Sequence, residues 1–332
     1  MIRFNASITA LLLILTVAPV AQAQTPATGA APTYPSKPIR IVVPYPAGGG
    51  IDIISRVIGE RLTQRLGQPV LVDNRAGGGT ILAAELVAKA APDGHTLMIT
   101  TDSTITINPH LYAKLPYDPV KDFAPVTQLV VLNQLLLANP ALPANNLKEL
   151  IAHAKANPGK LNYASYGSGS QPHLAMEMLK SQAGIDIVHV PYKGIPQAIP
   201  AALAGEVQLT FSGAASSQVH IKAGRLKALA VGGKSRLALL PEVPTFTESG
   251  FPDVPANAWF GVFVPAATPR EIVTKLHAEL TRILREPDFM EKEITAKGYD
   301  LVSSTPEEFA AFLSADSVRN ARAVKISGAK AE

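Results

Sequence analysis

The stretch IRIVVPYPAGGGIDIISRVIGERL, residues 39–62, decides how the fold begins. Its first five residues form an apolar run that ends at Pro44, which predicts a buried strand. Three consecutive glycines follow, and Ile51, Ile54 and Ile58 then recur at the spacing of one helix face. The stretch therefore predicts a strand, a tight glycine-rich turn and a helix.

The same alternation extends outward along the chain. Residues 70–72 predict a second strand, 80–90 an alanine-rich helix, and 96–100 a third strand. A strand–helix–strand–helix–strand order implies a parallel sheet with right-handed crossovers. A second set of alternating signals occupies residues 146–231. The expected fold class is therefore α/β, with two units of parallel-rich sheet.

Two such units predict two domains with a cleft between them. Open parallel sheets bind ligands outside the carboxyl ends of their strands, which places a site in that cleft. The apolar stretches 126–138 and 258–265 flank the second unit and are interpreted as two crossing strands. We expect residues 37–130 and 256–332 to form the first domain, and residues 131–255 to form the second.

Three helix starts carry a capping signature. Thr268 and Thr305 each precede a proline and stand three residues before a glutamate. Asn146 has the same spacing to Glu149. Because Ser, Thr, Asn and Asp side chains accept from the first free N–H groups of a helix, all three residues are predicted N-caps.

The first residues read as a targeting segment and not as part of the fold. Arg3 precedes an apolar run over residues 8–20, and Ala21-Gln22-Ala23 offers small residues for cleavage. The alternative, a membrane anchor, is disfavoured because the run is shorter than the roughly 20 residues that span a bilayer. We expect a signal peptide over 1–23, cleavage after Ala23, a flexible leader over 24–36, and a periplasmic protein.

Composition excludes several classes of function. The chain of 332 residues contains no cysteine, which removes thiol nucleophiles and thiolate metal sites. The formal net charge is +4, and the Lys and Arg residues are scattered instead of forming the basic stripe of a nucleic-acid surface. No cofactor, no metal and no nucleic-acid partner is therefore expected, and we expect a monomer.

Two glycine-rich loops follow predicted strands and open predicted helices. The first runs over residues 44–52 and the second over residues 163–173. Glycine allows the backbone to approach a ligand closely, and a helix N-terminus offers free N–H groups to an anion. Two such loops facing each other across a cleft predict a carboxylate site that needs no arginine. Two ordinary tight turns remain the alternative.

The sequences of these loops do not match the motifs of phosphate-binding, dinucleotide-binding or catalytic loops. Neither loop has the Gly-Lys-Ser/Thr of a phosphate-binding P-loop, and Pro172 stands where a dinucleotide fingerprint needs its third glycine. Ser168 does not lie within a Gly-x-Ser-x-Gly motif. No catalytic residue is assigned and no enzyme is expected. A serine hydrolase stays a distant alternative.

Taken together, several motifs resemble the Bug-type receptors of tripartite tricarboxylate transporters. The likeness covers nearly all of the chain after the predicted leader. The segments that carry it are residues 41–45 with Gly48-Gly49 and Asp52, 73–75, 77–80, 90–97, 108–109, 115–123, 190–194, 224–230, 240–245 and 259–261.

This resemblance implies a two-domain periplasmic-binding-protein fold of the Venus flytrap kind, with two crossing strands. It implies a small carboxylate held in the interdomain cleft and delivered to membrane transporter subunits. Use of the same fold for sensing, with a signalling partner, stays open. The ligand-binding residues that the resemblance and the loops assign are Tyr45, Pro46, Gly48, Gly49, Asp52, Thr101, Ser103, Ser165, Gly167, Ser168, Gly169, Ser170, His173, Lys193 and Ser212.

Several positions depart from the usual pattern of that family. Ile51 replaces a common threonine, Gln208 replaces a common aspartate, and Asp102 is unusual beside Thr101. Asp52 allows two interpretations. It fixes the first loop through the helix dipole, which we favour, or it contacts a hydrogen-bond donor on the ligand.

Overall fold

The computed structural model describes residues 1–2 and 34–330. The predicted signal peptide over 1–23 and most of the leader over 24–36 therefore lie outside the described residues. Within the predicted leader, the Tyr34 hydroxyl donates to the Gly94 carbonyl at 2.7 Å, so Tyr34 packs against the folded chain. Within the described residues, no helix is long and apolar enough to cross a membrane.

The first lobe forms around the strand and helix with which the sequence analysis began. Strand β1 pairs in parallel with β2 on one side and with β3 on the other. Ile41 and Val43 pack with Ile54 of α1, whereas Val42 packs with Ala83 of α2, as the twofold alternation of a strand requires. The elements are β1 (Ile39–Val43), α1 (Gly50–Leu66), β2 (Val70–Asn74), η1 (Gly78–Thr80), α2 (Ile81–Ala88), β3 (Thr96–Thr101), η2 (Ser103–Ile107) and α3 (Asn108–Leu111).

Strand β4 carries the chain from the first lobe to the second. It spans Phe123–Ala138, pairs with β9 through Asn133, and pairs with β7 from Gln134 onward. The return runs through Ala256, whose carbonyl accepts from the Gln134 N–H at 2.9 Å, into β9 (Asn257–Pro265). The chain therefore crosses twice at one place, next to Gln134.

The second lobe repeats the parallel arrangement, with β5 between β6 and β7. Its core is separate from that of the first lobe and includes Tyr163, Phe211 and Leu136. The elements are α4 (Leu147–Ala156), β5 (Asn162–Ser165), α5 (Gln171–Ala183), β6 (Val188–Pro191), α6 (Ile195–Ala204), β7 (Leu209–Gly213), α7 (Ala214–Lys222) and β8 (Lys227–Val231). Helices α6 and α7 were not predicted from the sequence.

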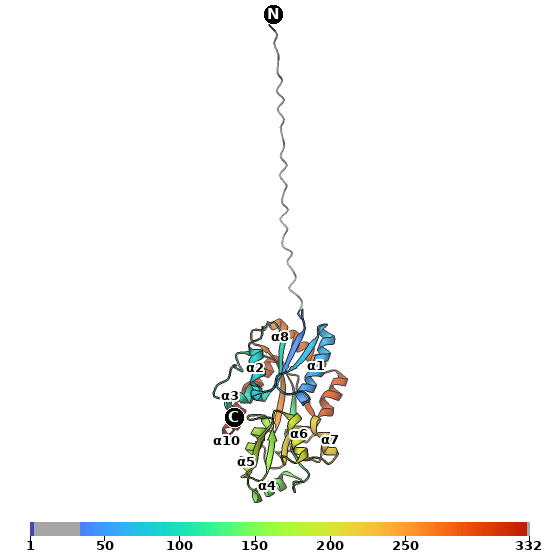
Figure 1. Ribbon diagram of the computed structural model, residues 1–332. Coiled ribbons are helices and arrows are strands. Elements are labelled where there is room, and N and C mark those ends of the chain that lie inside the picture. The colour runs from blue at the N-terminus through green and yellow to red at the C-terminus, as the bar shows by residue number, and fades with distance from the viewer. Residues whose placement is uncertain (3–33, 331–332) are drawn as a thin grey trace. The chain divides into compact units, whose positions relative to one another are not determined.

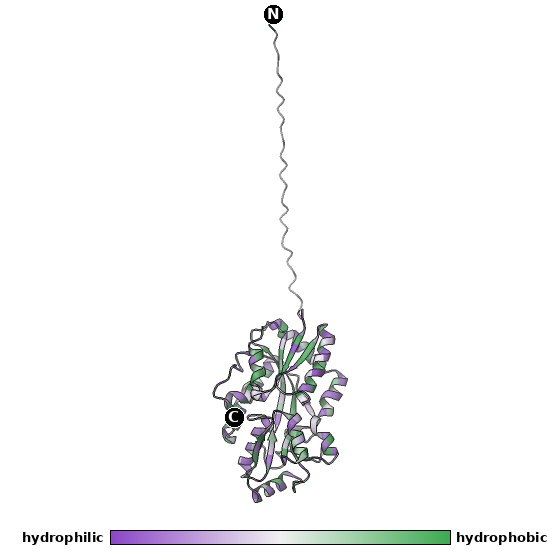
Figure 2. Ribbon diagram, in the orientation of Figure 1, coloured by the Kyte–Doolittle hydropathy of each residue, from purple (hydrophilic) through white to green (hydrophobic). Residues whose placement is uncertain are grey.

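The last part of the chain completes the first lobe. Its elements are α8 (Arg270–Leu284), α9 (Pro287–Phe289), η3 (Met290–Ile294), η4 (Thr295–Lys297), β10 (Tyr299–Leu301) and α10 (Pro306–Ser327). The strand order β2-β1-β3-β9-β4-β7-β5-β6 makes one sheet, with β8 and β10 also paired to β4. Helices cover this sheet (Figure 1). In Figure 2 hydrophobic residues gather on strands of the first lobe and polar residues on the outer turns of the helices.

Two of the three predicted N-caps are confirmed. Thr305 accepts from the Glu308 N–H in a complete capping box, and Asn146 accepts from the Glu149 N–H. The prediction for Thr268 is wrong, because Pro269 is the N-cap and the Thr268 hydroxyl instead donates to the Pro265 carbonyl at 2.7 Å. Because its hydroxyl is hydrogen-bonded to a backbone carbonyl three residues earlier, this side chain does not cap the helix.

Candidate functional site

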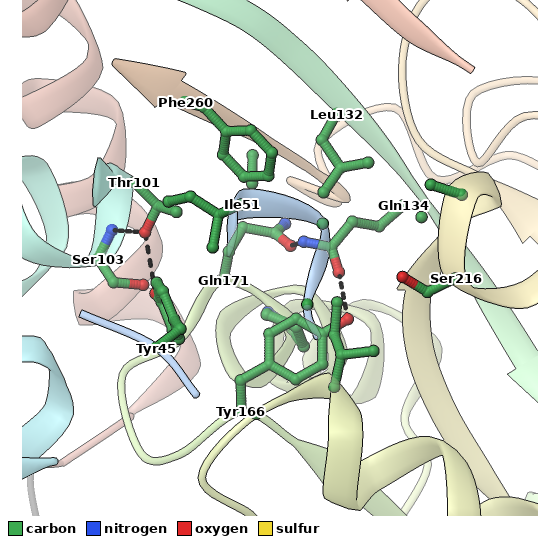
Figure 3. Close-up of a pocket in the computed structure, with 18 of the residues that line it drawn as sticks. Tyr45, Ile51, Thr101, Ser103, Leu132, Gln134, Tyr166, Gln171, Ser216 and Phe260 are labelled. Atoms are coloured by element: carbon green, nitrogen blue, oxygen red, sulfur yellow. Dashed lines mark hydrogen bonds between the residues drawn. The ribbon is translucent and has the colours of Figure 1, made fainter. Parts of the chain in front are cut away.

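A small cavity lies between the two lobes, next to the point where the chain crosses. Its volume is about 50 Å³, and a single water molecule needs about 10–15 Å³. The space therefore has room for a small ligand. We call it the first cavity (Figure 3). Its lining includes Tyr45, Pro46, Gly49, Gly50, Ile51, Thr101, Asp102, Ser103, Leu132, Gln134, Tyr166, Gln171, Gly194, Ile195, Gly213, Ala215, Ser216, Phe260 and Tyr299.

Four helices begin at this cavity. Their N-caps are Gly49 for α1, Ser170 for α5, Gly194 for α6 and Gly213 for α7. The first N–H groups of a helix have no partner within it, and the helix dipole adds partial positive charge there. First-turn residues that line the cavity are Gly50, Ile51, Gln171, Pro172, Ile195, Pro196, Ala215 and Ser216, and of these the two prolines have no N–H to offer. Both lobes thus direct groups that attract an anion toward the same space.

Side chains supply no positive charge to this space. Among the described residues that line the first cavity there is no Lys, Arg or His. Much of the wall is apolar, including Ile51, Leu132 and Phe260 (Figure 3). In this cavity, backbone N–H groups and uncharged polar side chains are therefore the groups that could bind an anion, and Asp102 is the acidic side chain in the wall.

Five of the predicted site residues line the first cavity: Tyr45, Pro46, Gly49, Thr101 and Ser103. The Tyr45 hydroxyl and Thr101 Oγ1 form a hydrogen bond of 2.9 Å, and the Ser103 N–H reaches Thr101 Oγ1 at 3.3 Å. The end of β3 and the first glycine-rich loop are thus joined, as the strand-end rule predicts.

Most of the second glycine-rich loop lines a separate, larger cavity. This second cavity has a volume of about 300 Å³ and shares Tyr45, Ser103 and Tyr166 with the first. The other predicted site residues in its wall are Gly167, Ser168, Gly169, Ser170 and Lys193. The structure therefore divides the predicted ligand-binding residues between two neighbouring spaces.

Five predicted residues line neither cavity: Gly48, Asp52, Ser165, His173 and Ser212. His173 Nδ1 accepts from the Gly169 N–H at 3.0 Å, and its ring stacks on His189 with centroids 4.0 Å apart. Ser165 Oγ and His189 Nε2 are 2.6 Å apart. Burial lowers the pKa of His189 to about 4, so this ring stays neutral at pH 7. Ser165 and His173 thus support the second loop from beneath.

Asp52 fixes the first loop. Its carboxylate accepts from the Gly48 N–H at 2.9 Å, from Asn74 Nδ2 at 2.9 Å, and from Arg56 Nε at 3.1 Å. Burial raises the pKa of Asp52, but the hydrogen bonds from Arg56, Gly48 and Asn74 outweigh it and hold the pKa below its usual value. These contacts favour the loop-fixing interpretation over ligand contact.

We expect Asp52→Ala to destabilise the protein by about 2 kcal/mol or more at pH 7, because several hydrogen bonds to a charged group are lost. The folded-state pKa is lowered, so this stability exists above the unfolded-state pKa and is lost as pH falls through the folded value. Urea unfolding at pH 7 and at pH 3 should show the difference between wild type and variant shrinking in acid. Asp288→Ala, which removes an exposed partner of Arg61, is the control and should cost clearly less than Asp52→Ala, because exposed ion pairs contribute little. An Asp52→Ala protein as stable as wild type at pH 7 would contradict this role.

Sequence reasoning missed several cavity residues, among them Gln134, Tyr166, Gln171, Gly213 and Ser216. Gln134 lies at the crossing point in β4, and its amide contacts Gln171 at the start of α5 (Figure 3). Gly213 and Ser216 begin a helix that the sequence did not reveal. Tyr166 and Gln171 lie within the second loop and were recoverable from the rule that first-turn residues face the ligand.

A cavity between two α/β lobes, approached by helix N-termini, together with the likeness to solved binding proteins, defines a ligand-binding protein of the periplasmic-binding-protein fold. Residues 54–328 match the family described as tripartite tricarboxylate transporter family receptor, and the chain belongs to this family. The family consists of binding proteins and not of enzymes, which removes the serine hydrolase alternative.

Three relatives illustrate the likeness. The protein BugT of Bordetella pertussis is 35% identical over 312 residues, which are 94% of this chain and 95% of BugT. A structure of R. palustris Rpa4515 with adipate has a TM-score of 0.86 at 32% identity and covers 90% of this chain and 100% of its own. MatC (Rpa3494) from Rhodopseudomonas palustris with bound malate has a TM-score of 0.83 at 32% identity, covering 88% of this chain and 100% of its own.

Proposed function

We propose that this receptor captures a small carboxylate in the first cavity, in the periplasm, and delivers it to membrane subunits of a tripartite tricarboxylate-type transporter. The observation that carries the proposal is the convergence of four helix N-termini on a cavity without a cationic side chain. Charge-assisted hydrogen bonds from N–H groups to a carboxylate contribute roughly 1.5–3 kcal/mol each. Several of them, offset by ordering costs, support a dissociation constant in the micromolar range or tighter.

Two further observations support a carboxylate. The cavity has apolar walls that suit a short carbon chain. Relatives of 32% identity hold adipate and malate in their structures. The proposal also takes the predicted export signal over residues 1–23 and the expected monomeric state as parts of the same function.

The test is a thermal-shift screen of small carboxylates, each paired with its uncharged amide. Ligand at 100 times its dissociation constant adds about 2.7 kcal/mol of apparent stability. We expect an acid to shift the melting temperature by several degrees and its amide to shift it far less, because the amide lacks the charge that helix termini favour. Equal shifts for acid and amide would contradict the proposal, as would conversion of the acid into a product.

A further inference from the structure

A third cavity lies behind the crossing strand β9, on the side away from the first cavity. In β9, Ala258 and Phe260 line the first cavity, whereas Asn257 lines the third. Trp259 faces the same way as Asn257, because successive side chains of a strand point to opposite faces, and its Nε1 donates to Asp316 of α10 at 3.0 Å. The volume of the third cavity is about 510 Å³. Its wall includes Lys234, Asp253, Val254, Arg319, Arg322 and Ile326.

Both lobes contribute to this wall. The first lobe supplies residues of α10, among them Arg319 and Arg322, and the second lobe supplies Lys234 and the segment 252–255. Hinge motion between two lobes changes the distance between groups that lie on different lobes. A partner that fills the third cavity therefore contacts both lobes at once and distinguishes one arrangement of the lobes from another, which a transporter needs to do when it recognises a loaded receptor.

Positive charge dominates the third cavity. Its charged residues are Arg319, Arg322, Lys234 and Asp253, so the cations outnumber the carboxylate by three to one. Within the part of the chain that the structure describes, the exposed side chains of Arg322 and Lys234 have no ion-pair or hydrogen-bond partner. Beside them Ile326 is 42% exposed. Arginine and apolar side chains together are typical of the surfaces by which proteins bind one another.

The three cations have different roles. Arg319 pairs with the buried carboxylate of Asp316, which also accepts from Thr106 Oγ1 at 2.7 Å. Loss of Arg319 would leave a buried carboxylate without its cation and would destabilise the fold. Arg322 and Lys234 have no such partner to support, so their charges are available to a binding partner and can be changed without disturbing the interior.

We propose that the third cavity is the docking surface for an acidic segment of a membrane subunit of the transporter, with Arg322 and Lys234 pairing with its carboxylates. The inference rests on the proposed function, which supplies the membrane partner. Charge complementarity selects the occupant, since carboxylates match the two free cations, and apolar side chains of the same segment match Val254 and Ile326. A basic segment is disfavoured.

The experiment is isothermal titration calorimetry of the unliganded protein with a synthetic peptide. The probe is an acetylated hexapeptide of four glutamates and two leucines, and its control has glutamines in place of the glutamates. At low salt we expect the wild-type protein to bind the acidic peptide at least tenfold more tightly than the control. Most of this preference should disappear in 1 M sodium chloride, where the screening length is about 3 Å.

Charge reversal at the two free cations locates the binding. The double variant Lys234→Glu with Arg322→Glu should bind the acidic peptide at least tenfold more weakly than wild type. Lys114→Glu with Lys148→Glu makes the same change in net charge at exposed positions outside the third cavity, and its affinity should stay within threefold of wild type. Melting temperatures check folding, and Lys234→Gln with Arg322→Gln replaces the reversal if that variant does not fold.

Other occupants of the third cavity would give other results. Pyrophosphate that binds more tightly than the acidic peptide would indicate a site for small anions. Vesicles of phosphatidylglycerol that bind wild type but not the double variant would indicate a lipid surface, and a dimer that the double variant loses would indicate a second copy of the chain. Each of these results would overturn docking of an acidic segment.

Two further results would also overturn it: absence of binding to the acidic peptide, and equal losses of affinity in the two double variants. These titrations contain no carboxylate ligand, so their failure leaves the carboxylate receptor standing. Failure of every acid in the thermal-shift screen would instead overturn the proposed function, and with it the membrane partner on which the docking surface depends.

Discussion

Gly194→Val is expected to weaken carboxylate binding by roughly 5- to 150-fold without destabilising the unliganded protein. Gly194 is the N-cap of α6 in the second lobe, and a Cβ atom there would lie 3.3 Å from Pro46 Cδ in the first lobe. Valine adds two methyl groups beyond that Cβ, and overpacking of this kind costs about 1–3 kcal/mol. Because Pro46 and Gly194 belong to different lobes, we expect this cost to fall on the state in which the two lobes enclose the ligand.

The backbone of Gly194 does not itself require glycine. Its φ of 161° is extended, so a valine there introduces no strain of its own. Calorimetric titration with the acid found in the screen measures the loss of affinity, and urea unfolding without ligand should differ from wild type by less than about 0.5 kcal/mol. Gly194→Ala should give a smaller loss, and Ala141→Val, at an exposed position, should give none. Unchanged affinity in Gly194→Val would show that Pro46 and Gly194 do not approach each other in the bound state.

The same reasoning explains why Gly169 is a poor position for such a test, although it lies in the second predicted loop. Its φ is +76°, which is unfavourable for a β-branched residue, and an added Cβ would overlap Leu111. A valine there would disturb the fold and the site together. Gly194 separates the two effects because its backbone is ordinary and its neighbour belongs to the other lobe.

The parts of the fold that local patterns predict are those in which one face of one element is buried. The apolar run before Pro44 and the isoleucines of α1 are such parts, and both elements form as predicted. Helix α6 was missed because Pro196 and Pro200 fall inside it, and proline ordinarily argues against a helix interior. Pro196 lies in the first turn, where the missing N–H is harmless.

The site was only partly predictable for a different reason. Loop residues such as Tyr45 and Gly49 carry a local signal, the glycine-rich turn before a helix. Gln134 carries none, because its role depends on meeting Gln171, which is 37 residues away in the sequence. Asp52 and His173 do carry the loop signal, yet each accepts a hydrogen bond from a backbone N–H of its own loop, and neither lines a cavity. A motif locates a loop, whereas tertiary packing decides which of its side chains face the ligand.

Asp102 gives the cavity a second feature that the sequence could only flag as unusual. It lines the first cavity, is 2% exposed, and accepts from the Ser103 N–H at 2.9 Å. Burial and the charge of Asp316 raise the pKa of Asp102 to about 7, and the hydrogen bond from the Ser103 N–H and the charge of Arg319 only partly oppose this. Asp316 itself is paired with Arg319 and accepts from Trp259 Nε1 at 3.0 Å. It does not line the first cavity, so its carboxylate does not contact a ligand there.

Binding of a carboxylate is therefore expected to weaken at least tenfold between pH 5.5 and pH 8.5, and Asp102→Asn should abolish most of this dependence. Below about pH 7 the Asp102 carboxyl is neutral, whereas above it an ionised group faces the anionic ligand. Two like charges about 4 Å apart repel by about 4 kcal/mol near a protein surface, so even a larger separation leaves an effect of on the order of tenfold.

The stability of the unliganded protein should change in a lower window, between the unfolded-state pKa of about 4 and the folded-state pKa of about 7. The folded-state pKa of Asp102 lies above its unfolded value, so its neutral form contributes stability that is present at low pH and lost as pH rises toward about 7. Asp102→Asn should accordingly be more stable than wild type at pH 8.5 and bind the acid more tightly there. Calorimetric titration at pH 5.5, 7 and 8.5 measures the affinity for the acid, and urea unfolding at the same pH values measures the stability. Asp253→Asn, which changes an exposed carboxylate outside the first cavity, is the control and should behave as wild type. If the Asp102→Asn protein kept the wild-type pH dependence, the titrating group would lie elsewhere and Asp102 would be a neutral wall of the cavity.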